Sequence, residues 1–190
     1  DDLGMLWQSM ERHLEAEPLL RRALEGRAVT LGSTHPDCLT SENNFAVSLF
    51  HLGKYQEAEP LLRHSLKSRE ASLGCSHPDS VQSMSNLAML LQAMGNPKEA
   101  EPLLRRALHR RADSLGPSHP GTVQLLNNLA MLLKAQGKLQ DAEPLLKGVL
   151  RSRLENLGPL HPDTLTSVEN HAMLLQAMGK HDEAEPLCRS

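Results

Sequence analysis

The chain of 190 residues repeats itself every 42 residues, and this period constrains its fold more than any single residue does. The segment Ala-Glu-Pro-Leu-Leu begins at residues 16, 58, 100 and 142, and it returns as Ala-Glu-Pro-Leu-Cys at 184. A second marker, Leu-Gly-x-x-His-Pro, begins at residues 31, 73, 115 and 157. Because a fixed period in this range is typical of stacked supersecondary units, the sequence predicts an array in which each unit packs on its neighbours.

Each unit contains two helical patterns, which are clearest in residues 77–118. Pro78 and Asp79 predict a helix start, since proline suits the first helical position and an acidic residue complements the positive end of the dipole. Gly95 predicts its end, because glycine readily adopts positive φ. Apolar residues recur between them at steps of three and four: Val81, Met84, Leu87, Ala88, Leu91 and Met94.

A second helix is predicted at roughly 98–115, closed by Gly116. Its apolar stripe consists of Ala100, Leu103, Leu104, Ala107, Leu108 and Leu115. We expect Pro102 near its first turn, because a proline in a helix interior costs about 3 kcal/mol. No strand pattern competes, so the chain is predicted to be all-α, with antiparallel helix pairs stacked into an α-solenoid. A HEAT-type array has a similar period and is the alternative fold.

The turn between the two helices resembles that of the tetratricopeptide repeat. The similar segments are Gly53-Lys54-Tyr55-Gln56-Glu57-Ala58 and Gly137-Lys138-Leu139-Gln140-Asp141-Ala142. The usual unit has about 34 residues. The longer unit here looks like that of kinesin light chains, on the residues Leu126-Asn127-Asn128-Leu129-Ala130 and Leu115-Gly116-Pro117-Ser118-His119-Pro120. The resemblance implies a right-handed superhelix and favours the tetratricopeptide fold over the HEAT type.

The period divides residues 1–190 into one array fragment. We expect a partial repeat at 1–34, full repeats at 35–76, 77–118 and 119–160, and a truncated repeat at 161–190. Asp2, Glu11 and His171 depart from the residues that the repeat pattern expects at their positions. Both ends are expected to fray, with fast amide exchange at residues 3–10.

Composition excludes several classes of function. The net charge of −3 with both signs interspersed argues against nucleic acid as a partner, and no apolar run is long enough to span a membrane. The odd count of cysteines (Cys38, Cys75 and Cys188) fits reduced thiols in a cytoplasmic protein. Aromatic residues are only 2% of the chain, so the core must consist of Leu, Ala and Met.

A polar face on the first helix of each unit is the candidate binding surface. It lies about 150° from the packing stripe, and the resemblance places it in the concave groove of the superhelix. Its members are Asn43, Asn44, Val47 and Phe50; Gln82, Ser85, Asn86, Met89, Gln92 and Ala93; Asn127, Asn128, Met131 and Lys134; and Glu169, Asn170, Met173 and Gln176.

The recurring asparagines Asn44, Asn86, Asn128 and Asn170 are the sharpest candidates. An amide offers donors and an acceptor, so it can hold a peptide backbone without reading its sequence. In the family resembled, such asparagines contact peptides. The alternative is that each asparagine bonds a neighbouring helix and fixes repeat stacking. Likewise Met89, Met131 and Met173 serve either adaptable binding or ordinary packing, and Lys134 and Glu169 reflect either partner choice or drift.

Two other recurring residues are predicted to be structural. The histidines His35, His77, His119 and His161 occur once per unit, so they cannot converge on a metal ion and are assigned to helix starts. The arginines Arg27, Arg69, Arg111 and Arg153 are expected to pair with an acid or carbonyl of a neighbouring unit. Contact with an acidic peptide at the groove edge is the alternative for these arginines.

No nucleophile, phosphate-binding or metal motif is present, so we predict neither an enzyme nor a bound cofactor. The predicted function is a protein–protein interaction scaffold that binds an extended peptide or helix of a partner protein in its groove. The resemblance adds a kinesin light chain-like cargo adaptor in a motor complex as the specific option. The alternative is the regulatory arm of a multidomain signalling NTPase, acting by autoinhibition or self-association.

Overall fold

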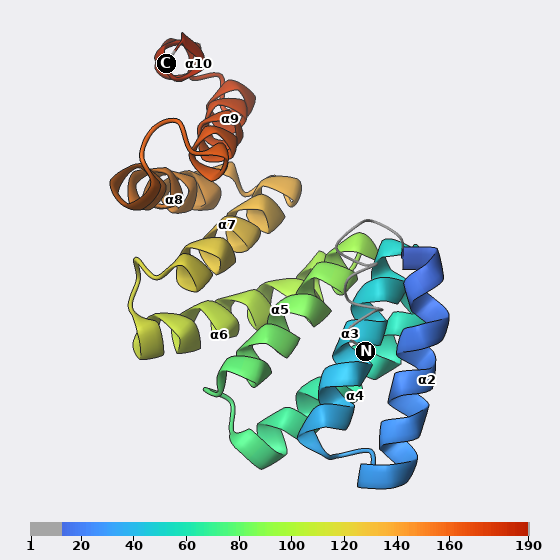
Figure 1. Cartoon of the computed structure of the whole chain (residues 1–190). Coiled ribbons are helices and arrows are strands. Elements are labelled where there is room, and N and C mark those ends of the chain that lie inside the picture. Colours follow the sequence, from blue (N-terminus) through green and yellow to red (C-terminus); the bar gives the residue numbers. More distant parts are fainter. Residues whose placement is uncertain (1–12, 190) are drawn as a thin grey trace. The chain divides into compact units, whose positions relative to one another are not determined.

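A computed structural model describes residues 13–189, and every regular element in that range is an α-helix (Figure 1). The first helices of the 42-residue repeats are α3 (Pro36–His51), α5 (Pro78–Ala93), α7 (Pro120–Ala135) and α9 (Pro162–Ala177). The second helices are α2 (His13–Leu31), α4 (Tyr55–Leu73), α6 (Pro97–Leu115), α8 (Leu139–Leu157) and α10 (His181–Arg189). The predictions for Asp2, Glu11 and residues 3–10 lie outside the described range.

The chain forms two compact units, residues 1–103 and 104–190. In the first unit, α3 packs against α2, α4 and α5, and α4 packs against α5. In the second unit, α8 packs against α7 and α9, and α9 packs against α10 (Figure 1). Each unit is therefore a stack of helix pairs joined by short turns, which confirms the all-α fold of repeated antiparallel pairs. None of the helices in residues 13–189 combines the length and the apolar character needed to cross a membrane.

The recurring histidine begins each first helix as predicted, and it does so as a cap. The Nδ1 atom of His77 accepts a hydrogen bond from the N–H of Asp79 at 3.2 Å. The other three histidines make the same contact two residues ahead, at 3.1–3.2 Å. The bond satisfies one of the donors that a helix start leaves unpaired, so the imidazole acts as serine or aspartate does at an ordinary N-cap. Gly95, with a φ of 78°, ends α5 as predicted.

The recurring proline of the second helix requires a correction. Pro102 lies inside α6, which begins at Pro97, so the proline is in the second turn and not near the first. Pro18, Pro60 and Pro144 lie inside α2, α4 and α8 in the same way. All four prolines are exposed. Water can therefore bond the carbonyl that the missing N–H leaves unpaired, which keeps the proline tolerable at this depth.

The buried surface of the first helix is broader than one stripe. Val81, Met84, Leu87, Ala88 and Leu91 are at most 2% exposed, as predicted, but Leu90 is also fully buried. The reason is that α5 contacts both α4 and its preceding counterpart α3, so apolar residues are needed on two sides. On the second helix, Ala100, Leu104 and Ala107 are fully buried, whereas Leu115 is 46% exposed. Leu115 is the last residue of α6, and its assignment to the packing stripe was wrong.

Three of the recurring arginines, Arg27, Arg69 and Arg153, bond a backbone carbonyl of the next helix pair, as predicted. Arg69 of α4 is buried and donates from Nη1 to the Asp79 carbonyl at 3.2 Å and to Ser83 Oγ at 3.0 Å, both on α5. From Nη2 it donates to Thr40 Oγ1 of α3 at 3.2 Å. Its partners are thus a backbone carbonyl and hydroxyl groups, and one guanidinium holds three helices together. Arg153 repeats the pattern in the second unit with Asp163, Ser167 and Gln124.

Candidate functional site

The predicted polar face forms a connected set of amides in the first unit. Asn86 of α5 donates from Nδ2 to Asn43 Oδ1 of α3 at 3.0 Å. Gln82 donates from Nε2 to Asn86 Oδ1 at 2.9 Å. We call the exposed or half-buried residues on this side of α3 and α5 the amide surface: Asn44, Val47, Phe50, Gln82, Asn86, Met89 and Gln92.

Two residues predicted for this surface lie beneath it. Asn43 is only 8% exposed and Ser85 only 6%. Asn43 reaches the surface through its bond to Asn86, so it positions that side chain instead of meeting solvent itself. The bond also shows that Asn86 takes part in stacking α5 on α3, which was the alternative interpretation of the asparagines. Stacking occupies one of the two Asn86 amide hydrogens, and an amide nitrogen carries a second one.

The second unit has corresponding residues on α7 and α9. Gln124 donates from Nε2 to Asn128 Oδ1 at 3.0 Å, which repeats the Gln82–Asn86 bond. Asn127, Asn128, Met131, Lys134 and Asn170 are half-buried, whereas Met173 and Gln176 are exposed. The Oδ1 atom of Asn127 is buried and has no hydrogen-bond partner among the described residues. The bonded Gln–Asn pair within one helix therefore occurs in each unit taken by itself.

Chemically, this surface suits recognition of a polypeptide backbone. An amide side chain presents a donor and an acceptor at the spacing of a peptide group, and it carries no charge that would select among side chains. Met89 is 42% exposed and Met173 is 54% exposed, so flexible thioethers stand beside the amides. Such side chains adapt to varied apolar groups. The arrangement offers hydrogen bonds and apolar contact, and no acid–base or nucleophilic chemistry.

A contact between Glu42 and His64 in the first unit was missed by the sequence analysis. Glu42 of α3 is 8% exposed, and each of its carboxylate oxygens lies 2.9 Å from His64 Nδ1 of α4. Burial raises the pKa of Glu42, while the bond to His64 and the charge of Arg69 lower it. The sequence contained a signal for this contact, because Glu42 departs from the repeat pattern. The equivalent positions one and two repeats later hold the apolar residues Met84 and Leu126.

Of the three residues that depart from the repeat pattern, His171 is the one that lies within the described residues. It is 8% exposed at the position held by Leu87 and Leu129 in other repeats, and its Nδ1 has no hydrogen-bond partner among the described residues. Burial lowers its pKa. Two smaller effects act in opposite directions, since the charge of Glu143 raises the pKa and the charge of Lys147 lowers it. The imidazole is therefore held neutral in an apolar position.

We expect His171→Leu to raise the free energy of unfolding by about 1 kcal/mol at neutral pH, since it removes an unpaired buried polar atom. The gain should grow as the pH falls below the ordinary histidine pKa, because only the unfolded wild-type chain then takes up this proton. Urea unfolding of both proteins at pH 7.5 and 5.5 measures the effect. A gain that is the same or smaller at pH 5.5 would contradict this assignment.

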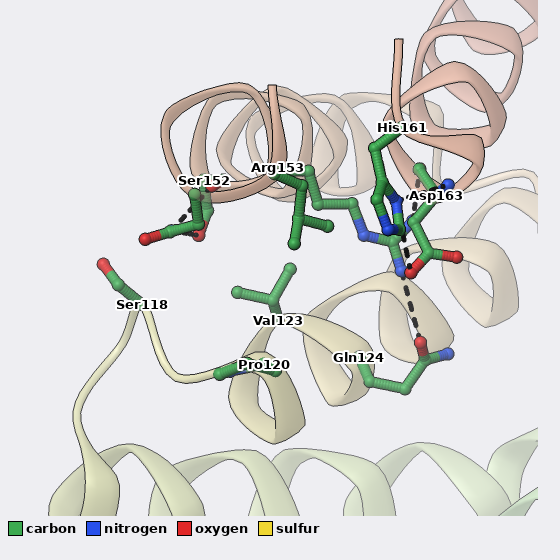
Figure 2. A pocket seen from close by; sticks show the side chains of 10 residues that line it. Ser118, Pro120, Val123, Gln124, Ser152, Arg153, His161 and Asp163 are labelled. Carbon is green, nitrogen blue, oxygen red and sulfur yellow. Dashed lines mark hydrogen bonds and ion pairs between the residues drawn. The ribbon is translucent and has the colours of Figure 1, made fainter. Parts of the chain in front are cut away.

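A small cavity of about 260 Å³ lies elsewhere in the second unit, at the junction of α7, α8 and α9. Its walls include Ser118, Val123, Gln124, Ser152, Arg153 and His161. Figure 2 shows Arg153 extending along one wall toward Gln124 and Asp163. The guanidinium is engaged by the three bonds that join α8 to α7 and α9, and His161 caps α9. The polar groups here therefore serve the fold, and the amide surface remains the candidate site.

The recurring histidines do not gather with other ligands. In residues 13–189, no group of three or more His, Cys, Asp or Glu side chains is placed to hold a metal ion. Cys38 and Cys75 are free thiols, and burial raises the pKa of Cys38.

Comparison with protein families identifies the repeat. The model described as tetratricopeptide repeat matches residues 2–71, 37–113, 79–154 and 121–189. These overlapping matches cover nearly the whole chain. No curated protein is similar enough to count as a match.

Solved structures of similar fold include kinesin light chain-like proteins. A Podosopora anserina protein of this type, with nearly identical TPR-like repeats, is 31% identical, with a TM-score of 0.86. The alignment covers 99% of this chain and 89% of that one. BtubC (BKLC) from P. vanneervenii is 23% identical with a TM-score of 0.84, over 97% of this chain and 74% of that one.

A more distant structure shares the fold alone. The Rap conjugation gene regulator of the plasmid pLS20, in complex with the Phr* peptide, is 15% identical with a TM-score of 0.73. The alignment covers 97% of this chain and 49% of the regulator.

Proposed function

The chain belongs to the tetratricopeptide repeat family, and on that premise we propose that it is a scaffold whose amide surface binds an extended peptide segment of a partner protein. The family and its structural neighbours support a protein–protein interaction scaffold. The binding surface and the form of the ligand are the parts that we add. They rest on the exposed side of the first helix in each pair.

One observation carries the proposal: the bonded series Gln82–Asn86–Asn43 on adjacent helices. The bonds fix the orientation of Asn86, so little side-chain entropy remains to be lost when it binds a ligand. Asn86 then presents its second amide hydrogen to an incoming backbone, and the Gln82 amide lies beside it. A preorganised donor beside an acceptor matches the C=O and N–H of an extended chain.

Apolar contact supplies the other part of the affinity. Val47, Phe50 and Met89 lie among the amides on the same surface, and each can cover an apolar side chain of the ligand. Hydrogen bonds exchanged with water contribute only about 1 kcal/mol each, so burial of such groups is needed for useful affinity. The peptide held by the distantly similar Rap regulator supports the view that this fold accommodates such ligands.

The decisive variant is Asn86→Ala, tested with a peptide selected from a displayed random library. The substitution should weaken binding about five- to tenfold, since it removes about one hydrogen bond. Asn86→Ala should also lower the free energy of unfolding by about 1 kcal/mol, because Asn43 loses its partner. Fluorescence anisotropy below the unfolding transition measures affinity, and urea unfolding measures stability.

Arg63→Ala is the matched control. Arg63 lies on α4, away from the amide surface, and pairs with Glu59 at 2.8 Å and Glu99 at 2.9 Å. Its loss should lower stability by up to about 1 kcal/mol and leave peptide binding unchanged. If Asn86→Ala lowers stability but binds the peptide as wild type does, the asparagine serves stacking alone and the proposed surface is wrong.

Cargo binding in a kinesin complex is a narrower form of this function, supported by the similarity to kinesin light chain-like repeats. It requires that the full-length protein copurify with a kinesin heavy chain. Absence of that association would leave the scaffold function and remove the motor-specific form.

A further inference from the structure

Charge is unevenly distributed between the two kinds of helix in the first unit. Past their first turns, the exposed and half-buried positions of α3 and α5 carry no Asp, Glu, Lys or Arg. The side chains there are amides, hydroxyls, apolar groups and His51, whose pKa is lowered by burial and by the neighbouring His13. By contrast, α4 exposes Glu57, Arg63 and Lys67. The segregation is marked for a chain in which 23% of all residues are charged.

An uncharged surface restricts the ligand that it can bind. A charged side chain laid on the amide surface would lose part of its hydration without gaining an opposite charge. An uncharged side chain loses little, and its backbone still gains the bonds to Asn86 and Gln82. The surface therefore discriminates against charged segments by desolvation, which is a form of selection that acts without any repelling group.

The aromatic residues give the same surface an apolar end. Phe50, near the end of α3, lies 5.6 Å from Tyr55 and 5.3 Å from His51, measured between ring centroids. In the other repeats, the position of Phe50 holds Gln92, Lys134 and Gln176. Ring faces of this kind bind proline and aromatic side chains well. The end of α3 is thus the part of the surface where apolar contact with a ligand is concentrated.

We propose that the ligand of the amide surface on α3 and α5 is an extended, uncharged peptide segment with a proline or aromatic side chain over Phe50. This inference rests on the proposed function and specifies the chemistry of the partner. The inferred preference applies to the first unit alone, because Lys134 and Glu169 place charges on the corresponding helices of the second unit.

The test uses the whole chain and twelve-residue peptides selected from a displayed random library. Each selected peptide is also synthesised in an acidic form and a basic form, with two uncharged residues replaced by Asp or by Lys. Fluorescence anisotropy gives Kd at 50 and 500 mM NaCl. The selected segments should be uncharged where they cover the amide surface. Their Kd should change less than about twofold with salt, and both charged forms should bind about tenfold more weakly.

Gln92→Lys supplies the sharpest variant, because it introduces the charge that Lys134 carries at the same position one repeat later. It should strengthen binding of the acidic form about three- to tenfold and make that binding salt-dependent. Gln56→Lys is the control, since Gln56 is an exposed residue of α4. It should leave the affinity of all three forms unchanged.

The outcomes separate this inference from the proposed function. If the selected peptides are acidic or basic, bind with strong salt dependence and still lose affinity with Asn86→Ala, the inference fails while the binding surface stands. If the selected peptides are unaffected by both Asn86→Ala and Gln92→Lys, the proposed surface fails and the inference with it. Uncharged peptides that lose affinity with Asn86→Ala and respond to Gln92→Lys as described support both.

Discussion

Replacement of Arg69 by alanine is expected to lower the free energy of unfolding by about 3 kcal/mol. The side chain is 4% exposed and bonds the Asp79 carbonyl, Ser83 Oγ and Thr40 Oγ1. Its loss leaves these acceptors without their donor and leaves a cavity where the aliphatic stem packed. Urea unfolding monitored by circular dichroism gives the free energy. Amide exchange should show the loss of protection concentrated in α4 and α5.

The chain provides a matched comparison in Arg111→Ala. Arg111 occupies the same position one repeat later, beside Gly121, but Leu125 stands where Arg69 finds the Ser83 hydroxyl. This variant should cost about 1 kcal/mol, because one charge-assisted bond is missing from the start. Arg69→Lys should recover only part of the loss, since an ammonium group cannot reach all three acceptors in the geometry of a guanidinium. Equal losses for Arg69→Ala and Arg111→Ala would contradict the assigned role of the hydrogen bonds.

Leu62→Ala is expected to lower the free energy of unfolding by about 3 kcal/mol, within the usual range of about 2–5 kcal/mol for a buried leucine. Leu62 is 1% exposed and is the second leucine of the Ala-Glu-Pro-Leu-Leu segment. Its truncation removes apolar burial and opens a cavity in the first unit. Urea unfolding again provides the measurement.

The adjacent Leu61 is the control, because it belongs to the same segment but is only half-buried. Leu61→Ala should cost clearly less than Leu62→Ala, about 1 kcal/mol. A result in which both truncations cost the same would contradict the inward position assigned to the second leucine of the segment.

The positions of the helices could be predicted closely from the sequence. The His-Pro start and Gly95 bound α5 correctly, and the second helix is expected at 98–115 against the observed Pro97–Leu115. These signals are local: a cap, a proline at the first position and a glycine of positive φ act within one turn of the helix end. A period of fixed length then repeats the same local result in every unit.

The errors concern contacts that depend on the neighbouring helix. Leu90 is buried because α5 has neighbours on two sides. A prediction based on one apolar stripe assumes a single neighbour and therefore leaves Leu90 out. Pro102 is tolerated in the second turn because that side of α6 is exposed to water. Which residues lie deep and which lie at the surface is decided by packing, and helical periodicity supplies only the direction of a side chain.

The candidate site shows the same limit. The sequence placed Asn43 and Asn86 on one face, but it could not reveal that Asn43 is buried and bonded to Asn86. Nor could it pair Glu42 with His64, because the two residues lie on different helices. What the period did provide was the set of positions where a repeat departs from the others, and both Glu42 and His171 belong to that set.

Nuclear magnetic resonance titration of the isotope-labelled chain with a selected uncharged peptide tests the central claim most directly. If the amide surface is the binding site, the shifted signals will be the backbone amides of α3 and α5 and the side-chain amides of Gln82 and Asn86. The exposed side of α4, including Arg63 and Lys67, will remain unchanged. Shifts confined to α4, or to the junction of α7, α8 and α9 around Arg153, would contradict the proposed binding surface.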